Sequence, residues 1–117
     1  MAAMALTELE HAVIAAIARV DPERSVMERQ LEAAQLLKRD HTGVGFYTTL
    51  TLPDGIALLD RGRWKIEDMG HGFAHHPDLP SGASFILWVR DGKISTLEGY
   101  TNEGDWPFDE TVFRVAS

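Results

Sequence analysis

The fold is decided by the stretch Phe85-Ile86-Leu87-Trp88-Val89-Arg90-Asp91-Gly92-Lys93-Ile94-Ser95-Thr96-Leu97-Glu98. Asp-Gly between two strand-like runs is typical of a two-residue type I′ hairpin turn. Such a turn pairs Arg90 with Lys93 and, counting onward residue by residue, Phe85 with Glu98. The predicted faces of the hairpin are Phe85, Leu87, Val89 and Ile94 on one side, and Ile86, Trp88 and Leu97 on the other.

Both faces of this hairpin are apolar, so we expect it to lie centrally, with helices over one face and a loop or another subunit over the other. Residues Val44 through Leu52 alternate in the manner of a further strand. Turn chemistry separates it from two short strand candidates, 56–59 and 64–66. Residues 111–115 are predicted to form a last, edge strand.

The N-terminal third predicts two helices. Thr7 and Glu10 have the spacing of a capping box, and apolar residues recur behind them at helical intervals as far as Val20. Ser25 and Glu28 repeat the capping spacing and predict a second helix to about Ala34. The next stretch, 35–41, either finishes that helix or forms a strand. The expected core residues of the helices are Leu9, Val13, Ile17 and Leu31.

These elements predict a single α+β domain over residues 1–117, with two N-terminal helices packed on an antiparallel sheet of about four to five strands. The chain is long enough to bury a core without disulfide or metal staples. It contains no internal repeat.

Composition excludes several classes of function. The chain has 11 basic and 18 acidic residues, a formal net charge of −7, and no cysteine. This charge has the wrong sign for nucleic acid or an anionic membrane, and the one basic cluster, 61–65, is flanked by acidic residues. Thiol chemistry is ruled out. The N-terminus does not read as a signal peptide and no run is long enough to span a membrane, so we expect a cytoplasmic protein.

Three segments carry a resemblance: Thr42-Gly43-Val44-Gly45-Phe46-Tyr47-Thr48, the stretch from Ser81-Gly82-Ala83-Ser84-Phe85 through the hairpin to Leu97-Glu98-Gly99-Tyr100-Thr101, and Trp106-Pro107. The pattern resembles a small family of uncharacterised bacterial domains with no established activity. It implies a bacterial α+β domain. Its glycine, aromatic and turn positions shape a fold more than they indicate chemistry.

Three histidines, His71, His75 and His76, lie close together in sequence. Two imidazoles four residues apart bind a metal only from a helix, and Gly72 and Pro77 argue against a helix here. A solvated loop is therefore the favoured interpretation. We expect no bound metal and no cofactor, although these three histidines are the only candidate ligands of note.

Glu98 is the most interesting carboxylate, because the predicted register places it opposite Phe85 on an apolar face. Such surroundings raise the pKa of a carboxyl toward that of a general acid or base. The alternative is that Glu98 reaches water or a neighbouring cation at the end of the sheet. Tyr100, Asn102 and Trp106 follow it in a polar and aromatic stretch with the composition of a ligand-binding loop.

No catalytic signature is present, so two hypotheses of function remain. The first is a non-enzymatic interaction domain that associates with itself or caps a basic protein partner, as an immunity protein caps a toxin. The second is a small-molecule-binding domain or enzyme in which Glu98 acts as acid or base beside His75 and its neighbouring histidines. Close approach of Glu98 and His75 would favour the second hypothesis.

Overall fold

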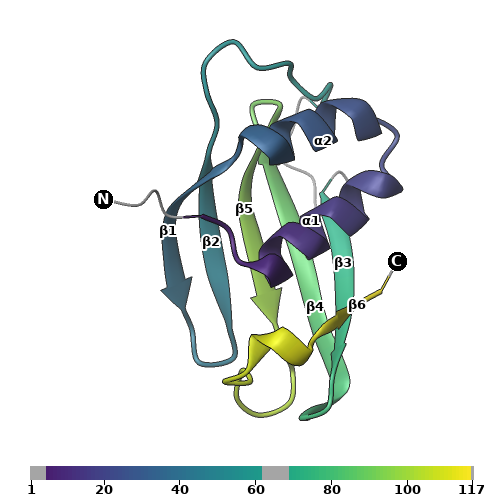
Figure 1. The fold of residues 1–117 in the computed structure, drawn as a ribbon, viewed down its shortest axis with the longest axis vertical. Coiled ribbons are helices and arrows are strands. Elements are labelled where there is room, and N and C mark those ends of the chain that lie inside the picture. Colours follow the sequence, from purple (N-terminus) through teal and green to yellow (C-terminus); the bar gives the residue numbers. More distant parts are fainter. Residues whose placement is uncertain (1–4, 62–68, 117) are drawn as a thin grey trace.

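The structure is a computed structural model and describes residues 5–61 and 69–116. It confirms the α+β class, with two N-terminal helices packed on one antiparallel sheet (Figure 1). The sheet has six strands in the order β1-β2-β5-β4-β3-β6, so the hairpin β4-β5 is central as expected. The elements are α1 (Glu8–Arg19), α2 (Arg24–Ala33), β1 (Gln35–His41), β2 (Gly45–Thr51), β3 (Gly70–His76), β4 (Leu79–Arg90), β5 (Lys93–Tyr100), a 3₁₀ helix (Glu110–Val112) and β6 (Arg114–Val115).

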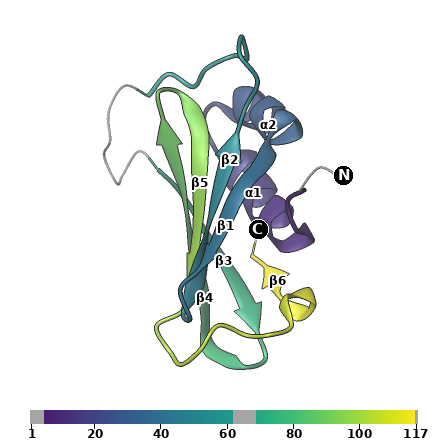
Figure 2. The same ribbon diagram turned by 90° about the vertical axis from the view of Figure 1, so that its left-hand side faces the viewer.

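The first helix begins where its capping box predicts. The Thr7 hydroxyl accepts from the Glu10 N–H, and the Glu10 carboxylate accepts from the Thr7 N–H. The predicted cap at Ser25 is wrong, because the N-cap of α2 is Glu23, two residues earlier, and it makes no side-chain cap. Both helices lie on the same side of the sheet (Figure 2). Their expected core residues Leu9, Val13, Ile17 and Leu31 are all buried.

Three other predictions of local structure need correction. Residues 56–59 form no strand, because this segment crosses over the hairpin turn as irregular chain. The histidine segment is strand β3 rather than a solvated loop. The C-terminal strand is shortened to Arg114–Val115 by the 3₁₀ helix before it. The strand candidate 64–66 lies outside the described residues, as does most of the basic cluster 61–65.

The hairpin turn has the predicted geometry, but the predicted pairing of β4 with β5 is wrong beyond Val89 and Ile94. Asp91 and Gly92 have φ values of 52° and 77°, as a type I′ turn requires. Val89 pairs with Ile94, but Trp88 pairs with Thr96, so Ser95 is an extra residue in β5. This β-bulge shifts each later pair by one residue. Leu97 consequently joins the buried face, and Glu98 lies opposite Ile86 on the other face, rather than opposite Phe85.

The two outer strands are irregular or short. Strand β1 carries a bulge at Leu37, between its pairs with Leu50 and Thr49 of β2. Strand β6 pairs with β3 over two residues only. No helix in the described ranges is long and apolar enough to cross a membrane.

Candidate functional site

The face of the sheet opposite the helices brings together side chains from four strands. Directly paired residues point to the same face of a sheet. The pairs Tyr47 with Glu98, Glu98 with Ile86, and Ile86 with His71 therefore place these four side chains in one row across β2, β5, β4 and β3. No helix of the described chain covers this face (Figure 2).

Glu98 is the centre of this face. One of its carboxylate oxygens accepts a hydrogen bond from the Tyr47 hydroxyl at 3.3 Å, and the other accepts from the Trp88 indole N–H at 3.1 Å. The side chain is half-buried, and a carboxylate oxygen has more than one lone pair. Both oxygens therefore retain acceptor capacity for a further donor.

A shallow depression of about 400 Å³ surrounds this carboxylate. We call it the open-face site. It is lined by Tyr47, Trp88, Arg90, Ser95, Thr96 and Glu98. The negative charge of Glu98 raises the pKa of Tyr47 above its ordinary value, with smaller contributions from desolvation and from their hydrogen bond. At neutral pH the site therefore presents a neutral phenol next to a carboxylate.

The three histidines do not gather into one site. Alternation along a strand places His71 and His75 on the open face, about 13 Å apart at a rise of 3.3 Å per residue, whereas His76 points to the other face. His76 is buried, and both of its ring nitrogens are engaged: Nε2 donates to the Asp109 carbonyl and Nδ1 accepts from the Asp78 N–H. Among the described residues, no three metal-ligating side chains lie close enough to hold a metal ion.

Glu98 and His75 are far apart on the open face. Strand β4 separates their strands, which puts their backbones about 10 Å apart across the sheet, and His75 is displaced further along β3. The His75 ring packs against Phe73 with centroids 4.9 Å apart. The arrangement therefore does not join these two groups in one proton-transfer site.

The other predicted binding residues are also dispersed. Tyr100 ends β5 on the open face, whereas Asn102 lies exposed in the loop that follows. Trp106 is half-buried and belongs to the core, where its ring stacks on Phe113 at 5.2 Å and meets Phe46 edge-on at 5.4 Å. The resulting aromatic cluster anchors the C-terminal segment rather than lining a pocket with Tyr100.

A buried ionic group joins α1 to β1 and β2. Glu10 is 1% exposed. Its carboxylate forms a bidentate ion pair with Arg39 and accepts a hydrogen bond from the Thr48 hydroxyl. Burial raises the pKa of Glu10, but the hydrogen bonds from Arg39, Thr48 and the Thr7 N–H lower it further than burial raises it. Because every oxygen is occupied, this carboxylate stabilises the fold rather than acting on a ligand. Its spacing from Thr7 predicts only the capping role of Glu10.

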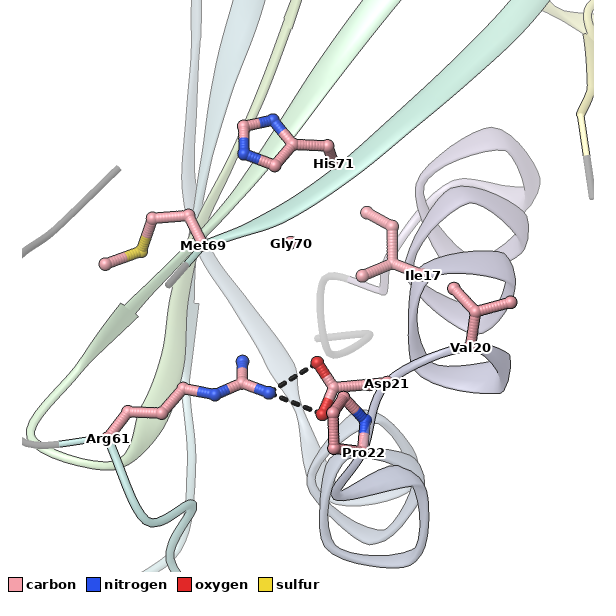
Figure 3. Close-up of a pocket in the computed structure, with 8 residues that line it drawn as sticks. All are labelled: Ile17, Val20, Asp21, Pro22, Arg61, Met69, Gly70 and His71. Carbon is pink, nitrogen blue, oxygen red and sulfur yellow. Dashed lines mark hydrogen bonds and ion pairs between the residues drawn. The ribbon is translucent and has the colours of Figure 1, made fainter. Parts of the chain in front are cut away.

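A second cavity, of about 350 Å³, lies where α1 ends beside the start of β3 (Figure 3). Arg61 reaches across it to the Asp21 carboxylate, and its Nε lies 3.4 Å from Glu23. Two carboxylates thus pair with one guanidinium, and the remaining walls include Ile17 and Val20. This contact ties the irregular segment before Arg61 to the junction of the helices, and its charged groups are engaged with one another.

The chain matches no protein-family profile, no curated protein and no solved structure.

Proposed function

We propose that the protein is a non-enzymatic interaction domain whose open-face site receives a cationic side chain of a basic protein partner. The observation that carries this proposal is the half-buried Glu98 carboxylate, held between the Tyr47 hydroxyl and the Trp88 indole on a face that the helices leave uncovered.

The chemistry of these three residues favours a guanidinium or ammonium group. Glu98 supplies the one negative charge of the lining, beside the positive charge of Arg90. Charge-assisted hydrogen bonds to a carboxylate are stronger than neutral ones. The rings of Tyr47 and Trp88 provide faces that attract a cation. Because the hydrogen bonds already fix the carboxylate, little side-chain entropy is lost when a partner binds.

The charge of the whole chain supports the same class of partner. A net charge of −7 raises the rate of encounter with a basic protein and opposes encounter with an acidic one. The positions of the three histidines support this function over the enzymatic alternative. His71 is separated from Glu98 by Ile86 of β4, and His75 lies further along β3, so neither is paired with Glu98.

Nitrogen-15 NMR titration with a short arginine-rich peptide tests the proposal. We expect shifts at the amides of Tyr47, Thr96 and Glu98, and weaker binding of the same peptide with citrulline, which keeps the shape of arginine without its charge. Glu98→Gln is the matched protein variant and should weaken binding by about fivefold or more. Equal binding of the two peptides, or shifts confined to the helices, would contradict the proposal.

A further inference from the structure

A buried nitrogen of Arg61 has no hydrogen-bond partner. Two of the three guanidinium nitrogens are engaged, because Nη2 donates to the Asp21 carboxylate and Nε lies 3.4 Å from a Glu23 oxygen. The third nitrogen, Nη1, is buried and lacks a partner among the described residues. In the view of Figure 3 it lies on the side of Gly70, where β3 begins. A buried donor without an acceptor is unfavourable, so an acceptor placed beside Nη1 would bind there.

Arg61 forms one wall of the cavity of about 350 Å³ between the end of α1 and the start of β3, which we call the Arg61 pocket. Its apolar walls run from the exposed Val20 to the buried Ile17 and Met69. The pocket therefore reaches from the surface toward the core, with a volume at the small end of ligand sites. Because Arg61 is itself a wall, an acceptor in the pocket needs only a small adjustment of this side chain to meet Nη1.

A second depression continues from the Arg61 pocket along β3. It has a volume of about 340 Å³ and shares Ile17, Val20 and His71 with the pocket. It lies beyond the two residues of β3 that pair with β6, Ala74 and His75. The rest of its lining is Ala16, Gly72, Phe73 and Ala116. The two depressions together form a groove between α1 and β3 that is polar at the Arg61 end and largely apolar along its length.

The charges around Nη1 favour a neutral acceptor over an ion. The guanidinium of Arg61 carries one positive charge, whereas the carboxylates of Asp21 and Glu23 carry one negative charge each. The three groups together are therefore negative and repel an anion. A cation brings donors and no acceptor to Nη1. A carbonyl oxygen accepts the hydrogen bond without adding charge to the pocket.

We propose that the Arg61 pocket binds a small neutral acyl compound, such as an aliphatic amide, with its carbonyl oxygen on Nη1 and its chain in the groove between α1 and β3. The hydrogen bond satisfies the unpartnered donor. The aliphatic chain is removed from water against Ile17 and Val20, which favours binding in proportion to the apolar area covered. The groove shares no lining residue with the open-face site, so this site is independent of the proposed function.

Nitrogen-15 NMR titration of the full chain with hexanamide tests the site, and hexanoate and hexylamine serve as charged probes of the same chain length. We expect hexanamide to shift the backbone amides of Val20, Gly70 and Gly72 and the Nε signal of Arg61. Hexanoate and hexylamine should each bind about tenfold or more weakly, because neither offers Nη1 a neutral acceptor. Shifts confined to other parts of the chain, or equal binding of hexanamide and either charged probe, would overturn the inference.

Variants separate the two ends of the groove. Arg61→Lys keeps the positive charge but removes Nη1, and it should weaken hexanamide binding by about tenfold or more. Val20→Asp places a charge on the apolar wall and should also weaken binding. Val44→Asp makes the same change at an exposed position outside both depressions and should leave binding unchanged, as should Glu98→Gln of the open-face site. Thermal melting of each variant verifies that the domain is folded.

A crystal structure of the wild-type chain with hexanamide identifies what meets Nη1 of Arg61. We expect the carbonyl oxygen within hydrogen-bond distance of that nitrogen and the aliphatic chain beside Ile17 and Val20. A water molecule at Nη1 that hexanamide does not displace would refute the proposed site. A folded Arg61→Lys variant that binds hexanamide as tightly as the wild-type chain would refute it independently.

Discussion

The side-chain amide of Gln30 replaces a neighbouring strand beside Ile94. Its oxygen accepts from the Ile94 N–H at 2.9 Å, and its nitrogen donates to the Gly92 carbonyl at 2.9 Å. Strand β2 pairs with β5 only as far as Thr49 and Thr96, so the start of β5 lacks a partner strand on that side. One donor and one acceptor in this position reproduce what a paired backbone would offer, and they attach α2 to the hairpin turn.

Removing this amide should destabilise the domain strongly. Gln30 is completely buried and also donates to the Ala57 carbonyl at 2.8 Å. Gln30→Ala leaves the Ile94 N–H and the Ala57 carbonyl without this partner, whereas the Gly92 carbonyl still accepts from the Leu59 N–H. We expect the free energy of unfolding to fall by about 2 to 4 kcal/mol. Urea denaturation measures this loss. Gln35→Ala, at an exposed position, serves as the control and should change stability by less than about 0.5 kcal/mol.

Stability should depend on pH through Glu10. Its pKa is lowered in the folded state from an ordinary value of 4.5. The ionised carboxylate therefore stabilises the fold above that value, and this contribution disappears as the pH falls through the folded-state pKa.

Glu10→Gln tests this dependence, because it keeps the shape but not the charge and leaves Arg39 unpaired. At neutral pH we expect a loss on the order of 3 kcal/mol, and the difference from wild type should shrink in acid. Chemical denaturation across a pH series measures both. Glu8→Gln, at an exposed position of the same first turn, should show neither effect. A constant difference at all pH values would contradict the assignment.

The hairpin turn should tolerate change at Asp91 but not at Gly92. A Cβ atom at Gly92 would lie 2.9 Å from both the Leu59 carbonyl oxygen and the Leu58 Cβ, in addition to the strain of φ +77°. We expect Gly92→Val to cost about 2 kcal/mol or more, and Asp91→Asn to be nearly neutral. Gly55→Ala separates the two causes, because Gly55 has φ +81° but open space around it. It should cost only the strain, about 1 kcal/mol, in the same denaturation assay.

Deleting Ser95 should leave the domain folded, because Ser95 is the extra residue of the bulge. Without it, regular pairing from the turn joins Trp88 to Thr96, Leu87 to Leu97 and Ile86 to Glu98, which are the pairs of the intact chain. Leu97 therefore stays in the core and Glu98 stays on the open face. Circular dichroism and thermal melting compare the deletion variant with Ser95→Ala. An unfolded deletion variant would contradict the assignment of Ser95 as the extra residue.

The phenol of Tyr47 reports on the charge of Glu98. Because that carboxylate raises the pKa of Tyr47, Glu98→Gln should lower the pKa toward the ordinary value for tyrosine. Ultraviolet titration of the phenolate measures the change. The chain has only two tyrosines, so a Tyr100→Phe background isolates the signal of Tyr47. An unchanged titration in Glu98→Gln would contradict the hydrogen-bonded geometry of the open-face site.

The sequence predicts those parts of the fold that depend only on residues close together along the chain. The capping box at Thr7 and the Asp91-Gly92 turn are both properties of a few adjacent residues, and both are confirmed. The bulge at Ser95 depends on which side chains the helices bury, so the residue-by-residue count from the turn assigned Glu98 to the wrong face.

Tertiary contact also explains the error at the histidine segment. Gly72 and Pro77 argue against a helix, and the sequence alone favours a solvated loop. The segment instead forms β3, because α1 packs directly against its glycines. A Cβ atom at Gly70 would come within 2.4 Å of the Ile17 side chain, and one at Gly72 would lie 3.2 Å from Val13. Neither this close approach nor the ion pair between Glu10 and Arg39 has a signal in the spacing of residues along the chain.

The outer edges of the sheet limit how copies of this chain can meet. The bulge at Leu37 interrupts the regular row of backbone groups that another chain would need, and the charges of Lys38 and Asp40 follow directly. At the other edge, β6 offers only two residues. Irregular, charged and short edges discourage strand-by-strand growth into fibrils. An aromatic residue such as the fully exposed Phe108 can therefore remain uncovered at high concentration, because any contact it makes joins side chains and leaves the sheet unextended.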